Sequence, residues 1–300
     1  MNDITVIIVA KDKPLHIFET VESIKTLADE IVILDIGLQQ EIIQKLKDYK
    51  NLHIITIKKN IPYVELIREE SKSYAKTEYV LFLDPDEIIP QTLAKKILDE
   101  YKKYDFISIP RKNIIFGKWI QNARWWPDYQ IRLFKKNAVT WHQKLHSQPT
   151  THGNGTTFEA KEELAITHHN YENITEYLMK MIRYAKSDAA EKSKTEYRLR
   201  LALKDGLNEF ISRYFAGHGY KDGMHGFILA TLQAIYYLLV YSYYWEERKY
   251  AQIEPDVYQA IDQTGKRSLF EIQHWLSKEN LFKRSGGIKR KILQFLLRDS

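Results

Sequence analysis

Three acidic side chains stand within four positions, directly after a strongly apolar run. Residues 79–83 are apolar, and Asp84-Pro85-Asp86-Glu87 follows at once. Such carboxylates suit Mg²⁺ or Mn²⁺, ions that take their remaining ligands from water and substrate phosphates. The alternative is a solvated acidic turn before the next helix, where Asp and Glu are also favoured. The position after a buried strand favours a metal site.

The first 110 residues contain the elements that would position these carboxylates. Short β-branched runs alternate with helical patterns, which predicts an α/β fold with a mostly parallel sheet. We expect strands at residues 4–9, 31–34, 52–57, 79–83 and 106–109. Ligands of such sheets bind beyond the carboxyl ends of the strands, where Asp35 and Asp84 both fall. Residues 111–170 show no clean period, as expected for a section that wraps over a site.

Composition excludes several classes of protein. Gly37 is the only glycine before residue 117, so neither G-x-G-x-x-G nor a P-loop lies in the α/β region. The absence of cysteine excludes disulfides, thiolate zinc sites and cysteine nucleophiles. With 45 Lys+Arg against 39 Asp+Glu, the net charge of +6 is too small to make nucleic acid the expected partner.

From Tyr171 onward the pattern is helical. We therefore predict a catalytic domain at 1–170 and a helical subdomain at 171–300. The run 227–245 is uncharged over nearly a membrane-spanning length, but it contains polar residues and five tyrosines. These favour a buried or interfacial helix over a true span. The N-terminus lacks the pattern of a secretory signal, so we expect a cytoplasmic protein.

Several segments together resemble glycosyltransferase family 2, whose members have the GT-A fold and use nucleotide-sugar donors. Asp84-Pro-Asp86-Glu87 resembles the family's D-x-D-E element. A subgroup that builds lipopolysaccharide cores and related cell-surface glycans is similar at the later segments. The matching segments, in order, are 5–12, 29–35, 84–87, 126–134, 166–171 and 219–226.

The resemblance implies roles for individual residues around the donor. Ala10 and Asp12 would belong to the donor-binding loop, Asp35 would contact the base, and Asp84 would contact the ribose or base. A metal, Mn²⁺ or Mg²⁺, would bridge Asp86 and the donor diphosphate and stabilise the leaving group. The resemblance also places Arg68 near the donor and Arg132 as a clamp on the donor diphosphate. It adds Asp84 and His168 as metal ligands. For Arg132 a surface salt bridge, and for His168 a hydrogen-bonded neutral imidazole, are the alternatives.

Family members invert the anomeric carbon, which calls for a base that deprotonates the acceptor hydroxyl. Asp128 is the candidate, with a simple turn residue after Pro127 as the alternative. Many relatives carry His-Glu where this chain has His146-Ser147, so the acceptor site is altered. His142 and His146 have zinc-ligand spacing without the peptidase glutamate, which favours a structural or acceptor-site role. Four tryptophans either stack on sugar rings or pack in the core: Trp119, Trp125, Trp126 and Trp141.

Together these features predict a metal-dependent inverting glycosyltransferase. Its donor would be a nucleotide sugar, and its acceptor a cell-envelope glycan or a lipid-linked glycan, as in lipopolysaccharide core or capsule. Two alternatives remain open at this point. A haloacid-dehalogenase-like phosphatase also carries D-x-D after a strand, but on the first strand. A non-catalytic scaffold would explain the altered residues at 35–39 and Ser147.

The basic excess is concentrated at the C-terminus. Residues 283–300 hold six Lys/Arg against one Asp, a local +5 that leaves +1 for the other 282 residues. Apolar residues beside these charges form the pattern of a helix that lies on an anionic membrane. A helix packed on its own domain is the alternative. We expect a protein bound peripherally to the inner face of the cytoplasmic membrane.

Overall fold

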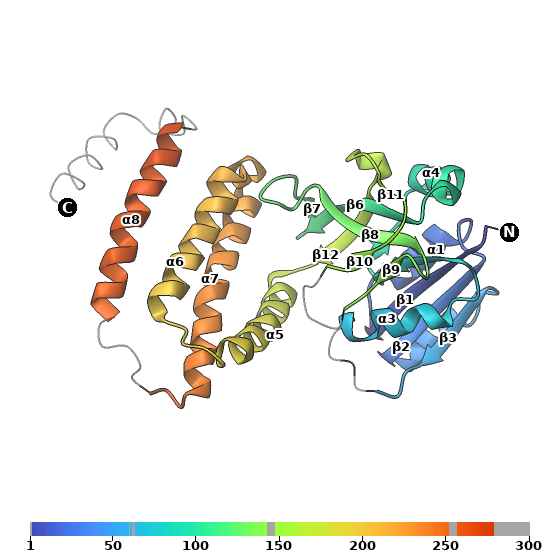
Figure 1. The fold of residues 1–300 in the computed structure, drawn as a ribbon, viewed down its shortest axis with the longest axis horizontal. Helices are drawn as coiled ribbons and strands as arrows, with labels where there is room; N and C mark the ends of the chain where they lie inside the picture. The colour runs from blue at the N-terminus through green and yellow to red at the C-terminus, as the bar shows by residue number, and fades with distance from the viewer. Residues whose placement is uncertain (1, 60, 62–63, 143–147, 252–256, 279–300) are drawn as a thin grey trace. The chain divides into compact units, whose positions relative to one another are not determined.

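The computed structural model describes residues 2–59, 61, 64–142, 148–251 and 257–278 (Figure 1). The chain divides into two compact units. The first, the sheet unit, comprises residues 1–119 and 126–170, and the second, the helical unit, comprises 120–125 and 171–300. Residues 120–125 thus group with the helices, although they precede the last strands of the sheet.

Four parallel strands form the first half of the sheet. They are β1 (Ile4–Asp12), β2 (Glu30–Leu38), β3 (Leu52–Thr56) and β4 (Tyr79–Leu83), in the spatial order β3-β2-β1-β4. The register pairs Ala10 with Asp35 across β1 and β2, and Ile8 with Leu83 across β1 and β4. Ala10, Asp35 and Asp84 therefore reach the same carboxyl edge of the sheet.

Helices cover both faces of these strands (Figure 1). Helices α1 (Ile17–Ile24), α2 (Gln40–Leu46) and α4 (Gln91–Glu100) pack in one core cluster with Val6 and Ile8 of β1. Helix α3 (Glu65–Ser71) packs in a second cluster with Ile7 and Val9. Because strand side chains alternate between faces, a continuous apolar strand such as β1 must be covered on both sides.

The section without a clean period completes the sheet with antiparallel and short strands. These are β5 (Glu87–Ile88), β6 (Phe106–Ile115), β7 (Lys118–Trp119), β8 (Asp128–Lys135), β9 (Val139–Thr140), β10 (Thr150–Thr151), β11 (Gly155–Thr157) and β12 (Ile166–Tyr171). The order continues from β4 as β8-β6-β12-β5, while β9 and β10 form a separate pair. Short 3₁₀ helices η1 (Lys72–Tyr74), η2 (Tyr101–Lys103) and η3 (Glu162–Leu164) link the strands. The result is an α/β fold with a mixed sheet and C-terminal helices, as predicted.

The helical unit is built from long helices. Its elements are α5 (Ile174–Lys192), α6 (Leu199–Ile211), the π-helix η4 (Ser212–Ala216), the 3₁₀ helix η5 (Gly219–Asp222), α7 (Met224–Glu247) and α8 (Val257–Lys278). Asn173 caps α5, since its side chain accepts a hydrogen bond from the Glu176 N–H at 2.9 Å. Tyr197 and Tyr244 lie in the core that α5, α6 and α7 share.

The glycine-rich segment 219–226 is explained by close packing. A Cβ atom on Gly226 would lie 1.8 Å from the Gly219 carbonyl oxygen, so only glycine fits there. Asp222 accepts a hydrogen bond from the Asn122 N–H at 3.0 Å and a longer one from Gln121. These bonds attach residues 120–125 to the helical unit.

Helix α7 contains the uncharged run found in the sequence. Among the described residues it alone is long and apolar enough to cross a membrane, a test of length and composition only. Only 22% of its apolar window is buried in the structure. The basic segment 283–300 lies outside the described residues, so its membrane contact stays a prediction.

Candidate active site

The acidic motif forms a tight turn at the end of β4. Asp84 donates its N–H to the Glu87 carboxylate at 3.0 Å, and Glu87 donates its N–H to the Asp84 carbonyl at 3.1 Å. Helix α1 supports this turn, because the Thr20 hydroxyl donates to the Pro85 carbonyl at 3.1 Å. The turn is therefore fixed by local hydrogen bonds and by α1, and it holds three carboxylates in defined positions.

Arginines from three elements surround Asp84 and Glu87. Arg132 of β8 is only 1% exposed; its Nη2 donates to Asp84 at 2.7 Å and also to Glu87. Arg111 of β6 donates to Glu87 at 3.1 Å. Arg68 of α3 lies 3.7 Å from the other Asp84 oxygen. Glu87 is fully buried and holds two of these guanidinium groups.

These charges decide the ionisation of Asp84. Burial alone would raise the pKa of the Asp84 carboxyl, but the positive charges of Arg132, Arg68 and Arg111 outweigh burial and hold its pKa well below the usual range. The pKa of Arg132 is raised in turn, because the charges of Asp84 and Glu87 outweigh its own burial. Asp84 is therefore a carboxylate at any physiological pH.

Asp86 faces a histidine instead of an arginine. Its Oδ1 lies 3.7 Å from His168 Nε2 on β12. The other ring nitrogen, Nδ1, lies 2.7 Å from the Asn113 side-chain oxygen, which orients the ring. Because 3.7 Å is less than twice a metal–ligand distance of about 2.1 Å, Asp86 and His168 fit one divalent ion. Asp84 was also predicted as a ligand, but both of its oxygens face guanidinium groups.

Asp128, the predicted base, lies at the start of β8. Arg111 Nη2 donates to it at 2.6 Å, Asn113 at 3.2 Å and Gln130 at 2.9 Å. Burial raises the pKa of the Asp128 carboxyl, but the charge of Arg111 and these hydrogen bonds outweigh it and lower the pKa. The carboxylate is thus ready to accept a proton at neutral pH, although its basicity is reduced.

Asp35 uses its oxygens locally. The N–H groups of Gly37 and Leu38 donate to Oδ1 at 2.8 and 2.7 Å, and the Thr56 hydroxyl donates to Oδ2 at 3.1 Å. Its side chain is largely buried. Asp12 is exposed, and its carbonyl accepts the Gln39 N–H at 2.9 Å. The structure thus brings Ala10, Asp35 and Asp84 to one edge of the sheet, and Asp35 binds the last residues of its own strand, β2.

Arg132 has a different environment from the one predicted. Both a diphosphate clamp and a surface salt bridge require an accessible guanidinium, whereas Arg132 is enclosed against Asp84 and Glu87. Arg132 is therefore a buried partner that holds the carboxylates of Asp84 and Glu87 in place.

The aromatic and histidine candidates are distributed between core and surface. Trp141 lies in the core cluster with Phe82 and Phe134, so it does not stack on a sugar. Trp119 and Trp126 contact each other edge to face in the sheet unit. His142 Nε2 lies 2.8 Å from the Thr150 hydroxyl, which gives it a structural partner.

His146 and Ser147 lie outside the described residues.

Sequence reasoning missed Glu87 as an anchor for arginines, and it missed Arg111 and Asn113. A signal was present, because strand side chains two apart share a face. Polar residues recur at this spacing in three strands that are neighbours in the sheet: 111 and 113 of β6, 128, 130 and 132 of β8, and 168 and 170 of β12. What was lacking was the knowledge that these strands pair.

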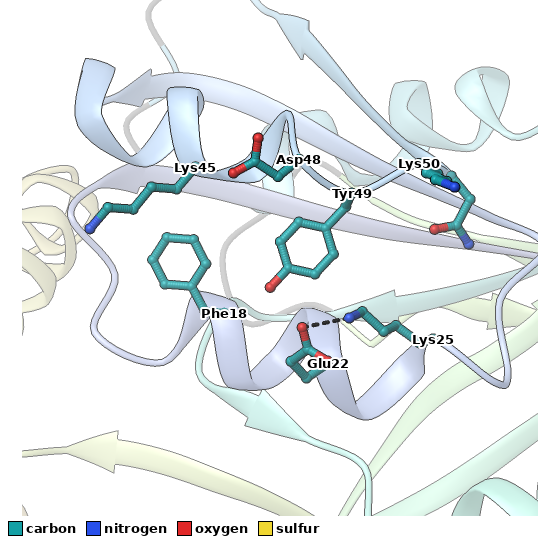
Figure 2. A pocket seen from close by; sticks show the side chains of 8 residues that line it. Phe18, Glu22, Lys25, Lys45, Asp48, Tyr49 and Lys50 are labelled. Atoms are coloured by element: carbon teal, nitrogen blue, oxygen red, sulfur yellow. Dashed lines mark ion pairs between the residues drawn. The ribbon is translucent and has the colours of Figure 1, made fainter.

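A cavity of about 680 Å³ lies elsewhere in the sheet unit, between α1 and the end of α2. Figure 2 shows the rings of Phe18 and Tyr49 beside it, with Glu22 and Lys25 joined in an ion pair of 2.7 Å. No residue of the acidic motif lines it. The predicted metal-binding carboxylates therefore lie outside this cavity.

A family model decides the identity of the sheet unit: Glycosyl transferase family 2 matches residues 5–159, more than half of the chain. The chain belongs to this family. It is therefore an enzyme that transfers a sugar from a nucleotide sugar. Membership also implies a divalent metal, for which Asp86 and His168 fit. The phosphatase and scaffold alternatives are wrong.

Solved structures of TarS from S. aureus are among those similar to this chain. The crystal structure of TarS 1-349 is 14% identical, with a TM-score of 0.42 over 86% of this chain and 94% of TarS 1-349. The structure of TarS 1-349 in complex with UDP-GlcNAc is 14% identical, with a TM-score of 0.42 over 86% of this chain and 95% of that one. The complex with UDP is 16% identical, with a TM-score of 0.41 over 85% of this chain and 94% of that one.

Proposed function

We propose that this family 2 glycosyltransferase is metal-dependent and inverting, and that it extends a cell-envelope glycan or its lipid-linked precursor. The observation that carries the proposal is the placement of Asp86 beside His168, next to the arginine-bound Asp84. Asp86 and His168 lie close enough to hold one ion, while the neighbouring Asp84 is fixed by guanidinium groups. This division suits a nucleoside-diphosphate donor, which needs both a cation and an oriented nucleoside.

The donor-side residues act by binding and orientation. Asp86 and His168 would hold a divalent ion, Mn²⁺ or Mg²⁺, which would supply Lewis-acid stabilisation of the leaving diphosphate. Asp84 stays charged and accepts hydrogen bonds from the ribose or base, with Arg132 fixing its position. Arg68 is 16% exposed at its side chain and contributes positive charge beside the diphosphate. Asp35, Ala10 and Asp12 shape the edge where the base lies.

Asp128 is the proposed general base. Inversion requires one proton to leave the acceptor hydroxyl as the new bond forms. Asp128 is ionised, and its contacts with Arg111, Asn113 and Gln130 hold it in one orientation. Asp128→Asn should abolish transfer and leave nucleoside-diphosphate binding intact.

The acceptor class rests on other features. Residues 126–134 resemble the subgroup that builds lipopolysaccharide cores, and an acceptor of that kind is found at a membrane. The sparsely buried α7 and the basic segment 283–300 support a peripheral position on the inner face of the cytoplasmic membrane. Deleting 283–300 should release the protein from anionic liposomes, and unchanged sedimentation would contradict this placement.

Calorimetry with UDP, GDP, CDP and ADP, each with and without Mn²⁺, tests the proposed metal site. We expect the wild-type chain to bind at least one of them more tightly with Mn²⁺. Asp86→Ala should lose at least ten-fold of that affinity without a fall in melting temperature. Asp48→Ala is the matched control, because Asp48 is an exposed carboxylate that lines the cavity of Figure 2, away from the acidic motif.

If Asp86→Ala bound as tightly as the wild type in Mn²⁺, the metal assignment would be wrong. If no nucleoside diphosphate bound the wild-type chain, the donor assignment would fall as well.

A further inference from the structure

Trp141 and Arg68 are in contact at the edge of the candidate donor site. The Arg68 guanidinium carbon lies 4.9 Å from the centre of the Trp141 ring, a cation–π distance. Arg68 is on α3, while Trp141 comes directly after β9, more than 70 residues later. Trp141 is only 9% exposed. The contact is therefore made by a buried ring and a guanidinium at the margin of the core.

The Trp141 ring is fixed from below by the core. Its centre lies 5.7 Å from that of Phe82 and 6.1 Å from that of Phe134. Phe82 stands two residues before Asp84 on β4. The ring thus connects the strand that carries the acidic motif with the arginine of α3.

Helix α3 also fixes the backbone around Trp141. The Trp141 N–H donates to the Glu69 carboxylate at 2.8 Å. Lys72 donates to the Val139 carbonyl at 2.7 Å and pairs with Glu69 at 2.6 Å. Three side chains of α3 and the adjoining η1, at positions 68, 69 and 72, therefore contact one short segment, residues 139–141. The position of the ring beneath Arg68 is defined on both sides.

Arg68 has a long side chain with several rotamers, and ordering such a side chain costs conformational entropy. It lies 3.7 Å from Asp84, a distance too long for a strong hydrogen bond. The flat face of Trp141 supplies a further contact that restricts the guanidinium. A restricted guanidinium loses less freedom when it binds a diphosphate.

We propose that Trp141 is a positioning residue for donor binding, which acts by holding the Arg68 guanidinium in place for the diphosphate. The proposal rests on the function proposed above. Trp141 itself does not touch the donor; its effect passes through Arg68. The ring, and not merely apolar volume, is the property that matters.

The test is a double-mutant cycle read by calorimetry with the nucleoside diphosphate that binds the wild-type chain most tightly among UDP, GDP, CDP and ADP in Mn²⁺. Trp141→Leu should weaken binding about three- to ten-fold, the range expected for loss of one cation–π contact. Trp141→Phe keeps an aromatic face and should stay within about two-fold of the wild type. In an Arg68→Ala background, Trp141→Leu should cause no further loss, because coupled residues do not act additively.

Ile67→Ala is the matched control. Ile67 is fully buried on α3, in the same core cluster as Trp141, so its truncation loosens the same core. It should lower the melting temperature and leave binding by folded protein unchanged.

Each other outcome is decisive. Equal losses from Trp141→Leu with and without Arg68, or an equal loss from Ile67→Ala, would show a merely structural role and overturn the inference alone. Absence of binding by the wild-type chain would overturn the proposed function, and the inference with it.

Discussion

Asp35 and Asp84 begin from the same local pattern and end in different environments. Asp84 directly follows the buried strand β4, whereas Asp35 lies in the last part of the buried strand β2, and both reach the same edge of the sheet. Asp35 is bound by two backbone N–H groups and a threonine hydroxyl. Asp84 is bound by arginines from α3 and β8 and has Arg111 of β6 close by. The first carboxylate stabilises the end of β2 and its contact with β3, and the second stabilises a cluster of charges.

The difference between the two aspartates comes from the residues that follow each of them in the chain. Just after Asp35 the register between β1 and β2 shifts, and Gly37, with a φ of 127°, lets two N–H groups point back at the carboxylate. Next to Asp84 the turn closes through the Glu87 side chain, which leaves the Asp84 carboxylate free to meet distant residues. Local turn chemistry therefore separates a structural carboxylate from a charged site.

The largest effect should come from Glu87. Glu87→Gln removes the charge that the buried Arg132 and the half-buried Arg111 share, and loss of one partner of a buried pair costs about 3–5 kcal/mol. Urea unfolding should show this fall in the free energy of unfolding. A loss below about 1 kcal/mol would mean that Asp84 and Asp128 suffice to hold the arginines.

Asp35→Ala should be the next largest change. It leaves two N–H groups and the Thr56 hydroxyl without their acceptor, at a cost of about 1–3 kcal/mol. The same urea titration measures it. An effect as large as that of Glu87→Gln would erase the distinction between the two sites.

Acid should lower the free energy of unfolding through the Asp84 cluster. The pKa of Asp84 is lowered in the folded state, so its stabilising contribution is complete well above the unfolded value near 3.9 and is lost as pH falls below that value. The loss should reach about 1 kcal/mol by pH 3. Asp84→Asn should unfold with a shallower dependence on pH between 5 and 3, and an unchanged slope would contradict the assignment.

The smallest effect is expected at Thr56. Thr56→Val removes one hydrogen bond to Asp35 and keeps the shape of the side chain, which costs about 0.5–1.5 kcal/mol. Thermal unfolding resolves a change of this size. Combined with Asp35→Ala it should add almost nothing, because the acceptor is already absent.

Much of the sheet unit was predictable because its strands are apolar throughout and its turns are short. The expected strands at 79–83 and 52–57 agree with β4 and β3 to within one residue. The candidate metal pair was half predictable: Asp86 follows from the acidic motif, while His168 came only from a family resemblance. Arg111 and Asn113 were missed, and so was the role of Glu87 as a partner of arginines, because these contacts depend on pairings between strands far apart in the chain.

The sequence by itself determined the order of the elements, the acidic turn after β4 and the family, because these depend on local patterns of apolar residues and on motifs. Only the tertiary structure decided which carboxylate meets an arginine, which meets a histidine and which closes its own turn. Those choices depend on how β6, β8 and β12 pair in the sheet, since pairing sets which side chains two residues apart face the end of β4. A local pattern places a carboxylate at an edge, and long-range packing supplies its partner.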